Sequence, residues 1–182
     1  IGIGQWSVLQ GNGFVASPNN PISSIGFSRG VNSFEWSISN GVCPVSRDTV
    51  TILVDSLAPL AFAGNNQSLC ENSVVQLNAS SLSYGSATWS SLASGVTFQN
   101  PALVNTTVVG LSVGQNDFIW TTSNGVCPSN SDTVSITIDQ LPSTSFAGND
   151  TSICESNNSI QLNAGIALSG TGQWFSILGA GT

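Results

Sequence analysis

Ser-Asn-Gly-Val-Cys-Pro occurs at residues 39–44 and again at residues 123–128, and Asp-Thr-Val follows at residues 48–50 and 132–134. Asn40 recurs as Asn124 and Cys43 as Cys127, with the same shift in both cases. This period is longer than that of a solenoid repeat and is typical of a string of small domains. Asn and Gly both tolerate a positive φ, so Asn-Gly between two apolar stretches predicts a tight β-hairpin. Each copy therefore predicts a hairpin at the same place in a repeated domain.

Apolar and polar residues alternate on both sides of the second hairpin. Phe118 and Trp120 precede it, and Val134, Ile136 and Ile138 follow it with polar residues between them. A period of two is typical of a half-buried strand. Strands are expected at Val74–Ala79, Ala87–Ser91, Thr106–Leu111, Asp117–Ser123 and Asp132–Ile138. Because no segment shows helical periodicity over ten residues, the sequence predicts an all-β chain.

Further motifs recur in the same phase and divide the chain. Phe-Ala-Gly-Asn stands at residues 62–65 and 146–149, and tryptophans recur as Trp6, Trp89 and Trp174 and as Trp36 and Trp120. We expect residues 1–58 to be the C-terminal part of one repeat, residues 59–142 a complete repeat, and residues 143–182 the N-terminal part of a further repeat. Pro59 and Pro142 lie at the joints, where proline cannot extend a sheet and stiffens the connection.

The charge of the chain limits its partners. Two arginines and no lysine stand against nine acidic residues among 182, and the net charge is −7. Such a chain can neutralise few phosphates, so we expect no nucleic acid partner and no docking onto anionic lipid. No apolar run approaches the length of a transmembrane helix, so no direct membrane insertion is expected.

The four cysteines recur at fixed repeat positions, which indicates disulfides, an oxidising compartment and an extracellular location.

Catalytic and metal-binding signatures are missing from the sequence. Without histidine or lysine no serine or threonine has a base to activate it, and Glu35 and Asp117 show no acid/base pairing, so we expect no catalytic residue and no enzyme. The sequence has no Cys-x-x-Cys pair and no clustered calcium loop, so no metal and no cofactor are expected. A calcium site at a joint, using Asn65, Asn149 or Asp150, stays open as an alternative.

The number of short strands expected in one repeat is roughly seven, and with a tryptophan in an early strand this fits an immunoglobulin-like (Ig-like) sandwich. Phe-Ala-Gly-Asn-Asn-Gln-Ser-Leu-Cys at residues 62–70, Val-Gln-Leu at 75–77, Trp89 and the Asn-Gly-Val-Cys hairpin resemble the PKD-like and Ig-like repeats of giant Bacteroidota surface proteins. Gliding-motility adhesins and other proteins of type IX secretion are members of that group. PKD domains usually carry Trp-Asp-Phe-Gly-Asp-Gly, whereas this chain has Trp-Ser-Ser-Leu at 89–92, so the resemblance is to a PKD-like variant. It implies tandem Ig-like (PKD-like) β-sandwich domains arranged end to end.

Two disulfide pairings are compatible with the sequence. The analogy with Ig-like repeats favours Cys70 with Cys127 inside the complete repeat, and Cys43 and Cys154 then pair with repeats outside the chain. The alternative joins Cys43 to Cys70 and Cys127 to Cys154, two pairs with the same spacing in the sequence. In an end-to-end string these pairs would have to bridge most of two domain lengths, whereas the Cα atoms of a disulfide lie about 4.4–6.8 Å apart.

The tryptophans and three hydroxyl residues are further candidate sites. Trp36, Trp89 and Trp120 alternate with small residues in expected strands, which indicates core packing over a sugar-stacking platform. Thr49, Thr133 and Ser56 stand in Asp-Thr-Val and Asp-Ser-Leu, which resemble the O-glycosylation sites of Bacteroidota. Thr49 and Thr133 occupy the same repeat position, and the alternative is a β-branched residue on the solvent face of a strand.

We therefore expect a structural repeat segment of a long secreted cell-surface adhesin, stalk or filament. Its expected partners are neighbouring repeats of the same or identical chains, with surface glycans as a further candidate. The phase of the repeat leaves two hypotheses: a segment of one continuous multi-repeat chain, or a unit that completes its end domains from neighbours in a filament. The rival function is a carbohydrate-binding accessory module of a secreted enzyme.

Overall fold

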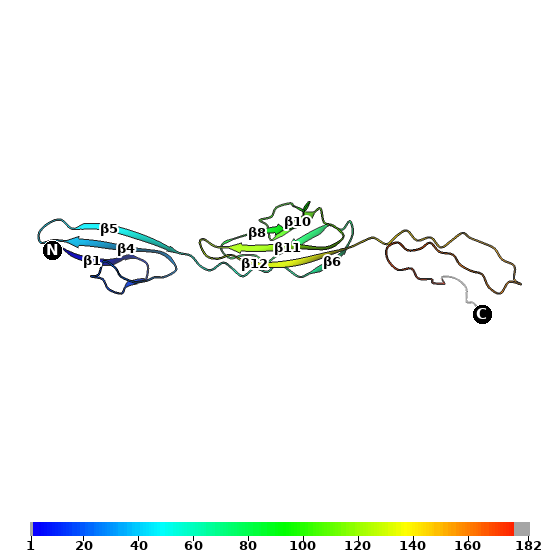
Figure 1. Cartoon of the computed structure of the whole chain (residues 1–182), viewed down its shortest axis with the longest axis horizontal. Coiled ribbons are helices and arrows are strands. Elements are labelled where there is room, and N and C mark those ends of the chain that lie inside the picture. Colours follow the sequence, from blue (N-terminus) through cyan, green and yellow to red (C-terminus); the bar gives the residue numbers. More distant parts are fainter. Residues whose placement is uncertain (1, 177–182) are drawn as a thin grey trace.

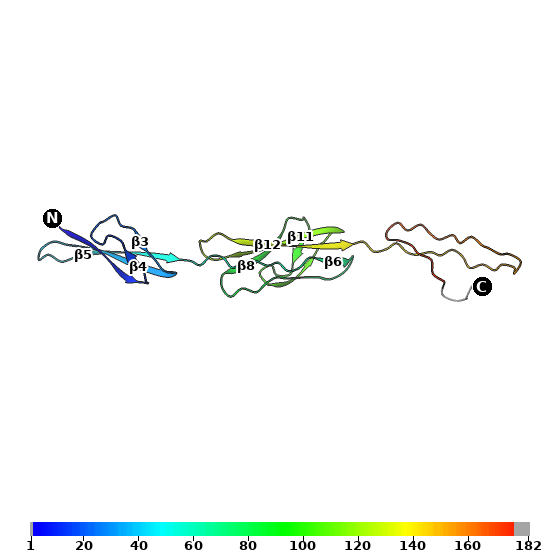
Figure 2. The same cartoon turned by 90° about the horizontal axis from the view of Figure 1, so that it is seen from below.

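The computed structural model describes residues 2–176, and these residues form twelve β-strands and no helix. The strands belong to two of three units that follow one another along the long axis of the molecule (Figures 1 and 2). We name them the first unit (residues 2–58), the middle unit (residues 59–142) and the third unit (residues 143–176). Residues 177–182, which the expected third domain includes, lie outside the described part.

The middle unit is an Ig-like β-sandwich of two sheets. Its strands are β6 (Gln67–Cys70), β7 (Val75–Asn78), β8 (Ser86–Ser91), β9 (Thr97–Phe98), β10 (Asn105–Val109), β11 (Gly114–Ser123) and β12 (Asn130–Asp139). One sheet has the order β6-β12-β11-β8, and the other has the order β7-β10-β9. β6 pairs with β12 in parallel, and the other pairs are antiparallel. The fold class expected from the sequence is confirmed.

The core of the middle unit lies between these two sheets. Trp89 and Trp120 are 3% and 1% exposed, and their ring centroids are 4.9 Å apart. The indole Nε1 of Trp89 donates a hydrogen bond to the carbonyl oxygen of Leu103 at 3.1 Å. The other buried apolar residues are Ala63, Val75, Leu77, Val108, Phe118, Val134, Ile136 and Ile138. The alternation along β11 and β12 thus places every second residue between the sheets.

The first unit contains the same later strands as the middle unit. These are β1 (Ile3–Gln10), β2 (Phe14–Val15), β3 (Ile25–Gly26), β4 (Gly30–Ser39) and β5 (Ser46–Val54). β1, β4 and β5 form one sheet in the order β1-β4-β5, and β2 pairs with β3. Trp6 lies opposite Trp36, as Trp89 lies opposite Trp120 in the middle unit. Among the described residues of this unit, no strand corresponds to β6 or β7.

The third unit corresponds to the beginning of the middle unit, and none of its described residues is in a strand. It nevertheless keeps two backbone hydrogen bonds of the middle unit. Gly165 N–H donates to Phe146 O at 2.8 Å, as Ser80 N–H does to Phe62 O at 2.9 Å. The turn after Cys154 likewise matches the turn after Cys70. The third unit therefore repeats the local backbone conformation of the middle unit, although none of its described residues belongs to a sheet.

Candidate functional site at the joint between repeats

The linker that leaves the first unit is hydrogen-bonded to the β11–β12 hairpin of the middle unit. Val126 N–H donates to Oδ2 of Asp55 at 3.0 Å, and Nδ2 of Asn124 donates to the carbonyl oxygen of Ser56 at 2.9 Å. The thiol of Cys127 donates to the carbonyl oxygen of Asp55, with 3.6 Å between sulfur and oxygen. The hairpin motif that recurs in the sequence therefore serves as the contact surface for the preceding linker.

The Asn-Gly turn makes this contact sterically feasible. Cys127 N–H donates to the carbonyl oxygen of Asn124 at 3.2 Å and closes the turn, and Gly125 has a φ of +54°. A Cβ atom at Gly125 would lie only 1.8 Å from Oδ2 of Asp55. Gly41, the equivalent residue of the first unit, has a φ of +57° with nothing within 4 Å of its Cβ position. Gly125 is thus required both for the turn and for the approach of Asp55.

Side chains of β12 hold the chain that follows the linker. The amide oxygen of Asn130 accepts a hydrogen bond from Ala61 N–H at 2.8 Å, and Oδ2 of Asp132 accepts one from Ala63 N–H at 2.8 Å. Oδ1 of Asn66 accepts a hydrogen bond from Ser135 N–H at 2.9 Å. The linker therefore continues into a segment that is fixed along the edge of the sandwich.

At the other end of the middle unit, Glu71 is hydrogen-bonded to the end of β12 and to the linker that leads to the third unit. Glu71 N–H donates to the carbonyl oxygen of Asp139 at 2.8 Å, and Leu141 N–H donates to Oε2 of Glu71 at 3.3 Å. Asp139 occupies the repeat position of Asp55. The residue after β6 thus anchors the end of β12 and the start of the following linker.

The four cysteines are free thiols in the structure. Cys70 ends β6 and lies opposite Asp139, the last residue of β12, whereas Cys127 lies in the hairpin before β12 begins. The ten residues of β12 separate them, roughly 30 Å at about 3.3 Å per residue. The expected pairing of Cys70 with Cys127 does not fit this placement, because bonded cysteines have Cα atoms about 4.4–6.8 Å apart.

The alternative pairing does not form within one chain either. Cys43 lies in the β4–β5 hairpin, at the end of the first unit opposite the joint (Figure 1), and Cys70 lies at the end of the middle unit that is farther from the first unit. Cys127 likewise faces the first unit, whereas Cys154 belongs to the third unit. Cys127 and Cys70 thus lie at the two ends of the middle unit, beside the joints to the first and third units.

The candidate glycosylation residues occupy two kinds of position. Thr49 on β5 and Thr133 on β12 are exposed, and they pair with Glu35 and Ile119 at the same register of their sheets. Ser56 is half-buried in the joint, and its carbonyl oxygen accepts the hydrogen bond from Asn124. A sugar on either threonine would project into solvent, whereas a sugar on Ser56 would sit at the contact between units.

Charged groups are dispersed, and two titratable groups are perturbed. Hydrogen bonds from the Ser135 hydroxyl and from the Gln115 amide lower the pKa of Asp117 below the ordinary value of 3.8. A hydrogen bond from the Ser156 side chain lowers the pKa of the Cys154 thiol. Arg47 and Glu35 form an ion pair on the surface of the first unit.

Neither a metal centre nor a membrane-crossing helix is found among residues 2–176. No three cysteine, aspartate or glutamate side chains in that range lie together as metal ligands. Asn65, Asn149 and Asp150, named for the alternative calcium site, are exposed. No helix there has the length and apolar character needed to cross a bilayer.

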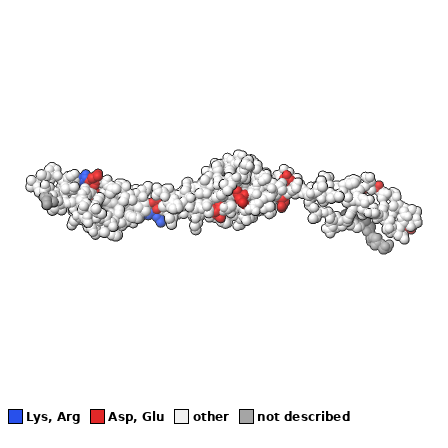
Figure 3. Space-filling view, in the orientation of Figure 1, with Lys and Arg blue, Asp and Glu red and all other residues white. Residues whose placement is uncertain are grey.

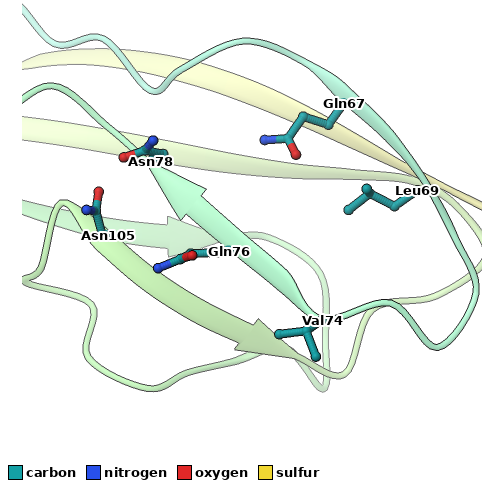
Figure 4. A pocket seen from close by; sticks show the side chains of 6 residues that line it. All are labelled: Gln67, Leu69, Val74, Gln76, Asn78 and Asn105. Carbon is teal, nitrogen blue, oxygen red and sulfur yellow. The ribbon is translucent and has the colours of Figure 1, made fainter.

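A shallow hollow opens where β6 and β7 approach from the two sheets. Figure 4 shows the side chains around it, and Asn78 and Asn105 lie side by side on neighbouring strands. The lining is mostly amide, with two apolar residues: Gln67, Gln76, Asn78, Asn105, Leu69 and Val74. Amides can donate and accept hydrogen bonds, but none of these groups transfers protons at neutral pH.

Two buried asparagines were not identified by the sequence interpretation. Asn32 and Asn116 are 0% and 2% exposed and occupy the same repeat position. Nδ2 of Asn116 donates to the carbonyl oxygens of Ser112 and Gly114 at 2.8 and 3.0 Å, and Asn32 makes the same two contacts with Ser28 and Gly30. Each asparagine holds the loop that enters a long strand. The recurrence of asparagine at the period of the repeat is the signal that could have identified them.

Comparison with known proteins returned structural similarity only. No protein-family model matches the chain, and no curated protein matches it. A solution structure of the PKD domain from KIAA 1837 protein matches 50% of this chain and 92% of that domain, with 22% identity and a TM-score of 0.39. Titin domains I67–I69, in an E-to-A variant, match 78% of this chain and 56% of that fragment, with 13% identity and a TM-score of 0.49. The Ig1 and Ig2 domains of DIP-gamma match 75% and 83%, with 13% identity and a TM-score of 0.40.

Proposed function

We propose that the chain is a structural repeat segment of a long, secreted cell-surface adhesin, stalk or filament. Its role is to hold other parts of the assembly at a distance, and it performs no catalysis itself. The observation that carries the proposal is the joint, where Asp55 and Ser56 of one unit are hydrogen-bonded to the hairpin of the next. Such contacts restrict bending between units that a free linker would permit.

Two properties of the surface support the proposed role outside the cell: its low charge and its exposed threonines. The face drawn in Figure 3 has acidic residues at several separate places, basic residues at two places beside acidic ones, and otherwise uncharged residues. A surface with only two positive charges binds acidic polymers weakly. Exposed Thr49 and Thr133 are the proposed attachment sites for O-linked sugars, which would shield the strand edges from proteases. The resemblance to Bacteroidota adhesins supports the proposed location on the cell surface.

The mechanical part of the proposal can be tested by measuring the distance between units. A cysteine-free variant receives spin labels at Thr49 and Thr133, which are both exposed and lie on β5 and β12. Double electron–electron resonance should give one narrow distance distribution, because the joint fixes the two units. A broad distribution would contradict a stiff stalk segment.

The location can be tested on intact cells of the source organism. Antibodies raised against the 182-residue chain should label cells that have not been permeabilised, and external protease should remove the label. Labelling only after permeabilisation would contradict the extracellular proposal.

The amide-lined hollow favours one second candidate, a carbohydrate-binding accessory module. Its four amide side chains could bind sugar hydroxyl groups. Against it, Trp89 and Trp120 are buried and offer no stacking face. Glycan-array binding by the full chain that is lost in Gln76→Ala, while the fold is retained, would favour this second function.

A further inference from the structure

The two Ser-Asn-Gly-Val-Cys-Pro hairpins hold the same Asn-Gly pair in the same turn. In both, the N–H of the cysteine that closes the turn donates to the asparagine carbonyl oxygen, of Asn124 or of Asn40, at 3.2 Å. Gly125 and Gly41 have φ values of +54° and +57°. The intrinsic chemistry of the two pairs is therefore alike, and a difference in their reactivity has to come from what surrounds them.

An asparagine that precedes glycine can lose its side-chain amide without any cofactor. The backbone nitrogen of the glycine attacks Cγ of the asparagine, and the bond from Cγ to the amide nitrogen breaks. The proton of the glycine N–H leaves with that nitrogen as ammonia, and a cyclic imide remains. Water then opens either carbonyl of the imide, which yields aspartate or isoaspartate. Glycine favours the attack because it has no Cβ atom to hinder the approach to its nitrogen.

At Asn124 the linker of the first unit opposes this reaction. Nδ2 of Asn124, the nitrogen that would leave, donates to the carbonyl oxygen of Ser56 at 2.9 Å, and the residue is half-buried. Oδ2 of Asp55 lies almost where a Cβ atom of Gly125 would stand. Turning the side chain so that Cγ meets the nitrogen of Gly125 would break the hydrogen bond to Ser56. The reactive geometry therefore requires that the linker first leaves the hairpin.

Asn40 provides a reference for the same turn within this chain. It is exposed, and its side chain makes no hydrogen bond among the described residues. Nothing lies within 4 Å of the Cβ position of Gly41. The two Asn-Gly pairs thus share the turn and differ in the contact with a linker.

We propose that Asn124-Gly125 is a deamidation site whose reactivity is controlled by the joint. While the linker is bound, Asn124 is protected, because reaction requires a local opening that breaks the contacts of Asp55 and Ser56. The rate of deamidation at Asn124 then follows the fraction of time for which the joint is open.

Deamidation in turn weakens the joint. A carboxylate only accepts hydrogen bonds, so the carbonyl oxygen of Ser56 loses its donor. Val126 N–H holds the carboxylate of Asp55 on the same turn at 3.0 Å, and a second carboxylate at position 124 repels it. Isoaspartate also inserts a methylene group into the backbone and so changes the shape of the turn. Because ammonia is lost to the solvent, a joint that has reacted does not recover when the linker returns.

This inference goes beyond the proposed function and can fail independently of it. A narrow distance distribution between the units together with rapid deamidation of Asn124 would overturn the inference and leave the stalk segment in place. A broad distribution together with slow deamidation that depends on Asp55 would contradict the stalk segment and support the inference.

The protection is tested with the full chain, incubated at mildly alkaline pH and analysed over time by mass spectrometry of chymotryptic peptides. Asn40 should deamidate several-fold faster than Asn124 in the wild type. Asp55→Ala should speed the reaction at Asn124 about fivefold, the factor expected for the loss of one partly exposed hydrogen bond, and should leave Asn40 unchanged. Equal rates at the two asparagines in the wild type would overturn the proposal.

Two variants separate the contact from other effects of Asp55. Asp139→Ala removes an aspartate at the same repeat position, whose side chain makes no hydrogen bond among the described residues, so the rate at Asn124 should not change. Asp55→Asn keeps an oxygen that can accept from Val126 N–H and removes the charge, so Asn124 should stay largely protected. Fast reaction in Asp55→Asn, as fast as in Asp55→Ala, would assign the protection to charge and refute control by the joint.

The consequence for the joint is tested with Asn124→Asp, which has the product side chain. The spin-label distance between Thr49 and Thr133 should broaden in this variant, and Asn40→Asp is the matched control in which it should stay narrow. The unfolding transition of the middle unit, followed in the same samples, shows whether its sandwich is retained. A distribution as narrow in Asn124→Asp as in the wild type would refute the release of the linker by deamidation.

Discussion

Val50 and Val134 belong to the same motif in two repeats, yet 45% of one side chain and 1% of the other is exposed. The strands around them pair in the same register, and both hairpins have the same Asn-Gly turn. What differs is the opposing layer, which β7 and its flanking segment supply in the middle unit only. The comparison shows that local sequence determines the strands, whereas closure of the core depends on a segment distant in the chain.

The largest expected effect on stability comes from substituting Trp120, which lies opposite Trp89, in comparison with Trp36, which lies opposite Trp6. Trp120 is 1% exposed, whereas Trp36 is half-buried. Trp120→Ala should destabilise the middle unit by about 3–5 kcal/mol, because it removes a large buried side chain and leaves a cavity. Trp36→Ala should cost the first unit less than half of that. Native-state hydrogen exchange, read at Ile136 for the middle unit and at Ile52 for the first unit, measures both values separately.

Trp120→Phe is the control for cavity size, since it retains most of the apolar volume and should recover a large part of the loss. If Trp36→Ala were as costly as Trp120→Ala, the sheet of the first unit would already be covered in solution. The first unit would then not differ from the middle unit in having an open core.

Substituting either of the two buried asparagines should destabilise its own unit by a similar amount. Asn116→Ala leaves the carbonyl oxygens of Ser112 and Gly114 without their donor, and Asn32→Ala does the same at Ser28 and Gly30. Each substitution should cost about 1–3 kcal/mol, the usual penalty for unsatisfied buried polar groups. The amides of Ser28 and Ser112, which donate to the asparagine side chains, report the loss by faster hydrogen exchange. A large loss in only one unit would show that the loop depends on closure of the core.

Sequence patterns were sufficient for the long strands of the middle unit. The five expected segments correspond to β7, β8, β10, β11 and β12, and their ends differ from the observed bounds by only a few residues. β6 and β9 were not predicted as segments. β6 has only one residue, Leu69, turned toward the core, and β9 has only two residues, so neither shows an alternating apolar pattern.

The joint could be predicted only in part. Pro59 and Pro142 indicated the boundaries, but the contact of Asp55 with Val126 joins residues 71 positions apart. Nothing in local periodicity reports such a contact. The cysteine pairing shows the same limit, because the parallel pairing of β6 with β12 places Cys70 at the far end of the sandwich.

The contribution of Asp55 to the joint can be measured by comparing Asp55→Ala with Asp139→Ala. Asp55→Ala should weaken the joint by roughly 1 kcal/mol, because the hydrogen bond from Val126 N–H is partly exposed to water. Asp139→Ala is the matched control, since the side chain of Asp139 makes no hydrogen bond among the described residues. Spin-label distances between Thr49 and Thr133 should broaden in the first variant and stay narrow in the second. Equal distributions in the two variants would show that the side chain of Asp55 does not stiffen the joint.

The smallest expected effect is a pH dependence that comes from Asp117, at a repeat position where the first unit has a serine. Ser135 and Gln115 hydrogen-bond to the carboxylate of Asp117 and lower its pKa, whereas Ser33 stands at the equivalent position and pairs with Thr51 at 3.0 Å. A lowered native pKa contributes stability above the ordinary value of 3.8, and this contribution is lost as the pH falls through the native pKa. Asp117→Ser, which copies the first unit, should therefore lower the stability of the middle unit slightly at neutral pH. The gap between wild type and variant should narrow below about pH 3.8 in urea unfolding curves, because protonation removes the charge that Ser135 and Gln115 stabilise. A gap that stays constant as the pH falls well below that value would mean that these hydrogen bonds do not depend on the charge of Asp117.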